Sequence, residues 1–218
     1  MAARFELAFD PAAALRQLRK DPVLARLIKR CGPFELQPMA CPSVFQALAE
    51  SIVHQQLNGK AAASIFARFA ALFPAPMKPI HILAAAEEAL RGAGLSRAKT
   101  LAIRDLAEKT EEGLVPTWAQ LRKLEDEAII ERLVQVRGVG RWTVEMLLIF
   151  RLGRPDVWPV DDFAVRKAFG QVFGLESPKA RDLADPAEAW RPYRSVVAWY
   201  LWRSLVTPPD AKLPSIVE

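Results

Sequence analysis

The sequence predicts an all-α protein. Nearly every segment places apolar residues at helical spacing, and two segments open with a capping aspartate followed by proline, Asp10-Pro11 and Asp21-Pro22. The alternation typical of a strand occurs only over residues 5–9, which have no second strand to pair with. Since no glycine motif follows a convincing strand, the sequence does not indicate a Rossmann or P-loop nucleotide-binding fold.

The individual helices follow from caps, prolines and apolar spacing. In the first half we expect two short helices before Gly32-Pro33, one from Ser43 to about Asn58, one over 59–73 capped by Asn58, short pieces up to Gly94, and one from Ser96 to Glu112. In the second half we expect a lead-in over 117–124, a pair of helices over 125–135 and 142–152, and helices from Asp162 to Phe173, from Ser177, from Asp185 and over 193–206.

The connection between the paired helices, Arg137-Gly138-Val139-Gly140-Arg141, is the most informative stretch. It is long enough only for a tight hairpin, and glycine adopts the positive φ that such turns use. The second helix would then begin with free backbone N–H groups, which can bind a phosphate of a nucleic-acid backbone. A plain helix–helix connection without a ligand is the alternative.

Composition adds weaker indications. The net charge of +5 is compatible with a polyanionic partner but does not demonstrate one. Cys31 and Cys41 lack metal-ligand spacing, and we expect reduced thiols, with a disulfide as the alternative. Residues 1–10 lack the features of a signal peptide and no apolar run reaches membrane-spanning length, so we expect a cytoplasmic protein with no membrane partner.

Two motifs resemble those of a known family. Residues 133–143, LVQVRGVGRWT, resemble the helix-hairpin-helix of the base-excision DNA glycosylases, and residues 158–162, WPVDD, resemble the Gly/Pro-rich loop and aspartate that complete that signature. The chain is most similar to the 3-methyladenine DNA glycosylase II branch, over about residues 42–205. This resemblance implies two helical domains with a cleft between them: 43–158, with the hairpin at about 125–152, and a second domain of 1–42 plus 159–218.

The resemblance also implies an activity. A member of this branch would be a monomeric base excision repair enzyme that flips an alkylated base, of the 3-methyladenine type, out of duplex DNA. It would then hydrolyse the N-glycosidic bond and leave an abasic site, acting in the cytoplasm on the bacterial nucleoid. A non-catalytic module that uses the hairpin only to hold DNA phosphates is the alternative, because a Gly-Val-Gly hairpin fits both.

The adjacent carboxylates Asp161 and Asp162 stand at a helix start. From their spacing alone, one would cap the helix and the other would be solvated. The resemblance instead makes Asp162 the catalytic residue and Asp161 its capping neighbour in the substrate pocket. A fixed carboxylate stabilises positive charge on the sugar and can orient or deprotonate water. Arg166, one turn further on, could pair with Asp162 and keep it ionised.

Trp142 indicates the type of reaction. Glycosylase/lyases of the superfamily carry a lysine two residues after the second glycine, where this chain has an indole, so we expect no covalent imine and no lyase activity. The four-cysteine iron–sulfur signature is also absent, as the chain has two cysteines. We therefore expect no cluster, metal or other cofactor, except for a monovalent cation that the hairpin carbonyls could hold.

The base pocket and the DNA contacts are likewise implied by the resemblance. Trp142 and Trp202 align with pocket aromatics, whose faces suit a cationic alkylpurine, while Met146 replaces an aromatic and so alters selectivity. The helix over 44–57 passes from apolar into polar residues, and the resemblance implies that this turn enters the minor groove with Gln56 or Leu57 as a wedge; emergence into solvent is the alternative. The expected DNA-contacting residues are Gln55, Gln56, Leu57, Arg137, Gly138, Val139, Gly140, Arg141 and Thr143.

Overall fold

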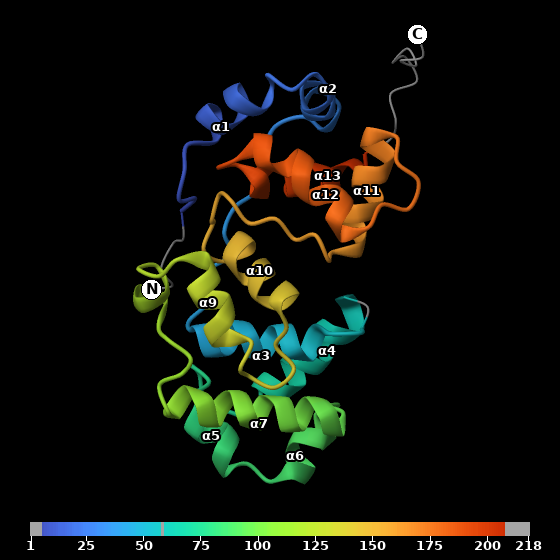
Figure 1. The fold of residues 1–218 in the computed structure, drawn as a ribbon. Coiled ribbons are helices and arrows are strands. Elements are labelled where there is room, and N and C mark those ends of the chain that lie inside the picture. Colours follow the sequence, from blue (N-terminus) through green and yellow to red (C-terminus); the bar gives the residue numbers. More distant parts are fainter. Residues whose placement is uncertain (1–5, 58, 208–218) are drawn as a thin grey trace. The chain divides into compact units, whose positions relative to one another are not determined.

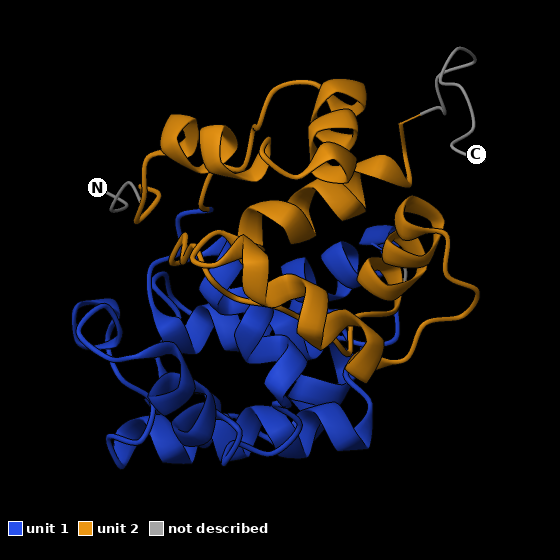
Figure 2. Cartoon of the chain, turned by 45° about the horizontal axis from the view of Figure 1, so that its top comes forward, with its two compact units in different colours: residues 1–5, 39–151 blue, residues 6–38, 152–218 orange. Residues whose placement is uncertain are grey.

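The computed structural model describes residues 6–57 and 59–207 of the 218. Regular structure in the described residues is entirely helical, which confirms the predicted fold class. The chain divides into two compact units (Figure 2). Among the described residues, unit 1 comprises 39–151, and unit 2 comprises 6–38 together with 152–207. Unit 2 thus joins segments from both ends of the described chain.

Unit 1 is built around α7 (Figure 1). Its helices are α3 (Val44–His54), α4 (Gly59–Ala70), α5 (Pro79–Ala84), α6 (Glu87–Gly92), α7 (Arg97–Glu111), α8 (Trp118–Leu121), α9 (Asp126–Leu133) and α10 (Arg141–Phe150). Helix α7 packs against α3, α5 and α6, and α10 packs against α9 and α3. Ile103 and Leu106 of α7 are fully buried, so one face of this helix forms the centre of the unit and fixes its neighbours.

Unit 2 is organised around the last helix. Its helices are α1 (Pro11–Leu18), α2 (Pro22–Cys31), α11 (Phe163–Phe173), α12 (Ala180–Ala187), the 3₁₀ helix η1 (Glu188–Trp190) and α13 (Arg194–Ser204). Helix α13 packs against both α2 and α11. Its buried residues Val197, Tyr200 and Leu201 share one hydrophobic core with Leu24 and Phe169. The N-terminal helices are therefore held by the C-terminal helix through apolar burial.

The boundaries between the units lie at 38/39 and 151/152, compared with the expected 42/43 and 158/159. The short connecting segments bond within the unit to which they belong. The indole N–H of Trp118 donates to the carbonyl of Cys41 at 3.0 Å, which ties residues 39–42 to unit 1. The backbone N–H of Ser195 donates to the carbonyl of Pro155 at 2.9 Å, which ties residues 152–158 to unit 2.

The predicted helix starts agree with the caps. Asp10, Asp21, Ser43 and Ser96 all accept hydrogen bonds from the first turns of their helices, as the sequence predicts. Beyond the caps, Cys31 and Cys41 are buried free thiols, as expected.

Some expected helix boundaries were wrong. Pro186 lies inside α12 and does not begin a helix of its own. Helix α3 ends at His54, before the expected 57–58. The alternation over 5–9 forms no strand in the described residues 6–9, in agreement with the all-α prediction. The predicted capping role of Asn58 lies outside the described residues.

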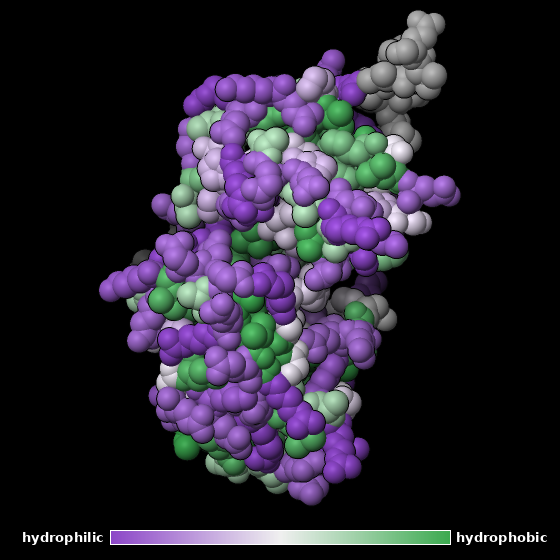
Figure 3. Space-filling view, viewed as in Figure 1, coloured by the Kyte–Doolittle hydropathy of each residue, from purple (hydrophilic) through white to green (hydrophobic). Residues whose placement is uncertain are grey.

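The surface shows how the apolar residues are distributed. In the view of Figure 3, hydrophilic residues cover most of the face, and hydrophobic residues appear in separate patches. The exposed large apolar side chains of the described residues include Leu57, Trp142 and Phe163, which belong to the segments expected to contact a ligand. In the described residues, no helix is long and apolar enough to cross a membrane.

Candidate active site and nucleic-acid interface

The predicted hairpin forms between α9 and α10. After α9, the N–H of Val136 donates to Leu133 and the N–H of Val139 donates to Val136, so two consecutive turns reverse the chain. Gly138 has a φ of +78°, which an L side chain rarely adopts. A Cβ on Gly138 would also lie 3.2 Å from the Cβ of Ala102 in α7. The positive φ therefore favours glycine at this position, and a Cβ would in addition crowd Ala102.

Gly140 differs from Gly138. Its φ is −96° and its ψ 170°, so Gly140 does not use the positive φ that glycine permits. A Cβ on Gly140 would meet no atom within 4 Å. Gly140 is the N-cap of α10 and, having no side chain, it offers no cap to the first N–H groups of that helix. Its contribution is to leave the start of α10 open to a ligand.

Side chains of α7 form hydrogen bonds with the backbone of the hairpin. A carboxylate oxygen of Asp105, Oδ2, accepts the N–H of Arg137 at 2.7 Å. The ammonium group of Lys109 bonds both oxygens of Asp105 at 3.0 and 2.9 Å and also donates to the carbonyl of Gln135. Since these bonds involve backbone groups of residues 135 and 137, they fix the path of the chain rather than the side chains that the hairpin displays.

The hairpin side chains fall into two groups. Arg137 is exposed, whereas Val139 and Thr143 are 4% and 5% exposed, so these two can offer a ligand little besides backbone atoms. Arg141 forms an ion pair with Glu127 and lies 3.8 Å from a carboxylate oxygen of the buried Glu145. Part of its charge is therefore balanced within unit 1.

The turn after α3 lies against the hairpin. The side-chain amide of Gln55 donates to the carbonyl of Gly138 at 2.8 Å, so this amide is engaged by the protein itself. Gln56 has a φ of +58°, uncommon for a residue other than glycine, and Leu57 is 40% exposed. The structure thus brings two predicted elements together: the 55–57 turn and the Gly-Val-Gly hairpin.

The first turn of α10 carries the predicted pocket residues of unit 1. Trp142 is 44% exposed, although most of the helix is buried. Met146, one turn later, is half-buried. An exposed indole flanked by a thioether offers an apolar, polarisable surface that can stack with a flat heterocycle.

Asp162 is the N-cap of α11. Its Oδ1 accepts the N–H of Val165 at 2.8 Å and the indole N–H of Trp202 at 3.0 Å, and the residue is 8% exposed. Asp161 is exposed and does not cap α11, so the expectation that it is the capping neighbour was wrong. Asp162 and Trp202, both predicted as site residues, are therefore brought together, and the N–H groups of Val165 and Trp202 hold the carboxylate.

Arg166 does not act as expected from the sequence. Within the described chain its Nε is buried without a hydrogen-bond partner, and it forms no ion pair with Asp162. A helical offset of four residues places two side chains on neighbouring turns, but an N-cap carboxylate turns toward the backbone N–H groups of its own helix. The indole N–H of Trp202 in α13 donates to Oδ1 of Asp162.

The loop that carries Asp162 is fixed at both ends. The indole N–H of Trp158 donates to the carbonyl of Leu183 at 3.0 Å. The backbone N–H of Asp162 donates to the carbonyl of Pro159, also at 3.0 Å. Before the loop, Asp156 receives the guanidinium of Arg194 on both carboxylate oxygens, at 2.7 and 3.0 Å. A carboxylate on such a loop is preorganised, because neither the loop nor its N-cap needs to rearrange.

Comparisons with known proteins agree with this geometry. Residues 49–192 match the family described as HhH-GPD superfamily base excision DNA repair protein. The chain belongs to the HhH-GPD superfamily. It is 37% identical to DNA-3-methyladenine glycosylase 1 of Schizosaccharomyces pombe, over 82% of this chain and 80% of that protein. It is also similar to DNA-3-methyladenine glycosylase 2 of Escherichia coli, at 26% identity over 78% of this chain and 61% of that protein.

Solved structures show the same fold. The S. pombe 3-methyladenine DNA glycosylase in complex with abasic DNA has a TM-score of 0.79 and 36% identity, over 88% of this chain and 96% of that one. A DNA-3-methyladenine glycosidase from Bacillus halodurans has a TM-score of 0.80 and 34% identity, over 93% and 92% of the two chains. The HhH-GPD fold is thus shared over nearly the whole described chain.

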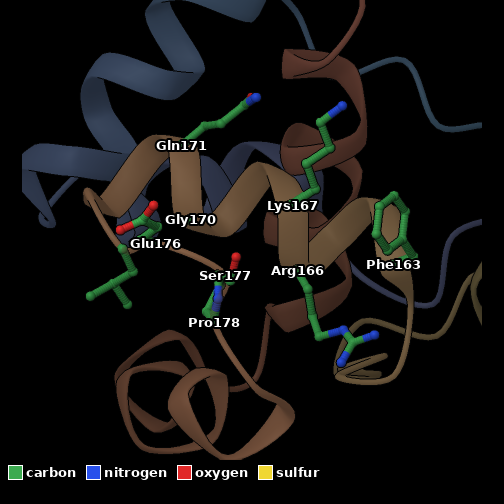
Figure 4. A pocket seen from close by; sticks show the side chains of 9 residues that line it. Phe163, Arg166, Lys167, Gly170, Gln171, Glu176, Ser177 and Pro178 are labelled. Carbon is green, nitrogen blue, oxygen red and sulfur yellow. The ribbon is translucent and has the colours of Figure 1, made fainter.

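A groove along α11 is a feature of this HhH-GPD protein that the sequence did not predict (Figure 4). It has a volume of about 600 Å³ and is lined by Phe163, Arg166, Lys167, Gly170, Gln171, Leu175, Glu176, Ser177 and Pro178. A Cβ on Gly170 would lie 2.6 Å from the carbonyl oxygen of Leu175, so glycine allows the wall of the groove to approach the helix. Arg166 and Lys167 point to opposite sides of α11 in Figure 4 and do not converge on one anion.

Three charged residues of α7 that support the HhH-GPD site, Lys99, Asp105 and Lys109, were not predicted. The i,i+4 spacing of Asp105 and Lys109 was visible in the sequence. The backbone partners of the three residues, however, lie 26 to 46 residues away. Phe163, the first residue of α11, directly follows Asp162 and is 73% exposed.

Proposed function

We propose that this protein is a monofunctional DNA glycosylase that removes alkylated bases of the 3-methyladenine type from duplex DNA. The observation that carries the proposal is the carboxylate of Asp162, held as an N-cap with Oδ1 bonded by Val165 and Trp202. Membership of the HhH-GPD superfamily and the likeness to the 3-methyladenine glycosylases of S. pombe and E. coli support it.

Asp162 would act on the sugar of the flipped nucleotide. Breaking the N-glycosidic bond leaves positive charge on the anomeric carbon and the ring oxygen of the deoxyribose. A carboxylate already fixed in place stabilises that charge without reorganisation, and it can orient or deprotonate the water that attacks. The C–N bonding pair leaves with the base and the water oxygen bonds to the sugar, so the product is an abasic site.

The leaving group determines how much help the reaction needs. An alkylpurine that carries positive charge departs as a neutral base, so no strong general acid is required. The exposed indole of Trp142 is suited to such a base, because a cation over an indole face is attracted by the ring quadrupole. Met146 and Trp202 would add apolar contacts, and Phe163 is a further aromatic beside the carboxylate.

DNA would be held mainly through its backbone. The hairpin offers main-chain N–H groups at the uncapped start of α10, and Arg137 is exposed beside them. Contacts of this kind position a duplex without reading its sequence. The 55–57 turn, with Leu57 or Gln56 at its tip, would fill the space that the flipped base leaves.

Water, rather than an amine, would be the nucleophile. A lyase needs an amine to form an imine with the opened sugar, and the position that supplies it in lyases of this superfamily holds Trp142 here. Borohydride should therefore trap no covalent adduct between the protein and lesion DNA, and the abasic strand should remain intact. Efficient trapping with the wild-type protein would refute hydrolysis by water.

The proposed cofactor requirement is confined to a monovalent cation at the hairpin. The carbonyl of Gln135 accepts from Lys109 and that of Gly138 accepts from Gln55, so each oxygen keeps one further lone pair for a cation. Its contribution would appear as a difference in DNA affinity between potassium chloride and tetramethylammonium chloride at equal ionic strength. Equal affinity in the two salts would argue against the cation.

The protein would act as a monomer on the nucleoid, in the cytoplasm.

Base release tests the proposal as a whole. Duplex DNA treated with a methylating agent is incubated with the protein, and the free bases are separated by chromatography. We expect release of 3-methyladenine, and a panel of 7-methylguanine, ethenoadenine and hypoxanthine substrates would then define the range of lesions. Tight DNA binding with no released base would favour the alternative, a non-catalytic hairpin module.

A further inference from the structure

Lys99 lies behind the turn that follows α3. Its ammonium group donates to the carbonyls of Val53 at 2.7 Å and Gln55 at 2.8 Å. These carbonyls belong to the last turn of α3, where a helix leaves its C=O groups without internal partners and where a positive charge is favourable. Burial lowers the pKa of Lys99, so the ammonium is partly withdrawn from water. One side chain thus closes the end of this helix.

The turn that Lys99 closes has an uncommon backbone conformation. Gln56 has a φ of +58°, in the left-handed region that is unfavourable for a residue with a Cβ. Such a conformation persists where its surroundings hold it. Lys99 holds the turn on one side, and the amide of Gln55 ties it to the carbonyl of Gly138 on the other.

We propose that Lys99 is a positioning residue that sets the wedge: it fixes the 55–57 turn so that Leu57 faces the DNA in register with the hairpin. This inference rests on the proposed glycosylase function. Because Gln55 joins the turn to Gly138, the wedge and the phosphate anchor behave as one rigid piece. DNA binding at the hairpin then places the wedge without a separate ordering step, which lowers the cost of flipping a paired base.

A second side chain of the same helix provides the comparison. Asp105 holds the N–H of Arg137 and therefore the hairpin, whereas Lys99 holds the 55–57 turn. The two residues should thus have different phenotypes. Loss of the Asp105 carboxylate should weaken the affinity for undamaged duplex, while loss of the Lys99 ammonium should slow base release on DNA that is already bound.

The experiment measures single-turnover base release at saturating protein from two duplexes. In one the lesion is paired, and in the other it lies opposite an abasic site, so that flipping costs less. Lys99→Met should lower the rate on the paired lesion about tenfold, as expected for a lost charge-assisted hydrogen bond, and the rate on the unpaired lesion much less. Lys123→Met, at an exposed lysine of the same unit, is the matched control.

A double-mutant cycle identifies the route of the effect. If Lys99 acts through the wedge, Lys99→Met should have little further effect in a Leu57→Ala background. Lys99→Arg, which keeps a charged donor, should recover part of the lost rate. It replaces Lys99→Met in the experiment if Lys99→Met does not fold. An unchanged thermal unfolding temperature of the variant shows that a lost rate reflects positioning and not loss of the fold.

Equal losses on both duplexes, additivity with Leu57→Ala, or wild-type rates in Lys99→Met would each overturn the inference while the glycosylase function stands. Absence of base release by the wild type would instead overturn the proposed function, and this inference with it.

Discussion

The hairpin and the Asp162 loop serve the proposed reaction by different means. The hairpin offers main-chain groups, and its path is set by Gly138 and by side chains of α7 that bond its backbone. The loop offers one carboxylate, whose position depends on Val165 and Trp202. Main-chain contacts survive any substitution that preserves the path of the chain, whereas catalysis by a carboxylate depends on two oxygen atoms. Changes in the hairpin should therefore affect affinity, and changes in the loop should affect rate.

The largest effect should come from Asp162→Asn. An amide keeps the shape of the side chain but has no negative charge for the developing cation, so base release should fall by about 10³-fold or more, while DNA affinity changes little. Single-turnover kinetics and fluorescence anisotropy with lesion duplex measure the two quantities. Asp161→Asn, at the exposed neighbour, is the control. Activity retained in Asp162→Asn, or lost in Asp161→Asn, would contradict the assignment of the carboxylate.

Trp202→Phe tests how the carboxylate is held. Phenylalanine keeps an aromatic ring but cannot donate to Oδ1 of Asp162. A hydrogen bond to a charged group contributes about 1.5–3 kcal/mol, so the rate should fall roughly 10- to 150-fold without a change in the affinity for undamaged DNA. A loss of affinity equal to the loss of rate would show that Trp202 acts chiefly by binding and not by orienting Asp162.

Trp142→Ala removes an indole that belongs to the first turn of α10, in unit 1, and that is expected to contact the flipped base. Stacking of a base on an aromatic side chain is worth about 1–3 kcal/mol, so base release should fall roughly 5- to 150-fold on lesion DNA. Affinity for undamaged duplex should change much less, since there the base remains stacked in the helix. Trp199→Ala is not a suitable control, because Trp199 packs against Phe34 and Tyr200; Val134→Ala, at an exposed apolar residue before the hairpin, is better.

The sequence predicted the local features of both regions well. Caps, prolines and glycines act within a few residues, so the starts of α1, α2, α3 and α7 and the hairpin itself could be identified from their own residues. Asp161 and Asp162 could not be told apart in the same way, because either carboxylate can cap a helix and only the backbone decides which one does.

Contacts between distant segments were out of reach. The bonds from Lys99 to Gln55 and from Arg137 to Asp105 join residues 44 and 32 positions apart, and no local pattern encodes them. The sequence also does not indicate which of the two hairpin glycines adopts positive φ, and in the structure it is Gly138.

Substitutions of the two hairpin glycines should have the smallest effects, and they distinguish the two positions from each other. Gly138→Ala places a Cβ at a φ of +78°, next to Ala102, and should cost on the order of 1–2 kcal/mol, or roughly 5- to 30-fold in affinity if the hairpin distorts. Gly140→Ala meets neither obstacle and should change affinity by about twofold or less.

Binding of undamaged duplexes of unrelated sequence is measured over a range of salt concentrations. Affinity should fall with salt and vary little with sequence, because the contacts are to phosphates. Equal losses in both variants would mean that the approach of the phosphate, and not backbone conformation, requires glycine. Undiminished affinity in both would show that the hairpin is only a connection between two helices.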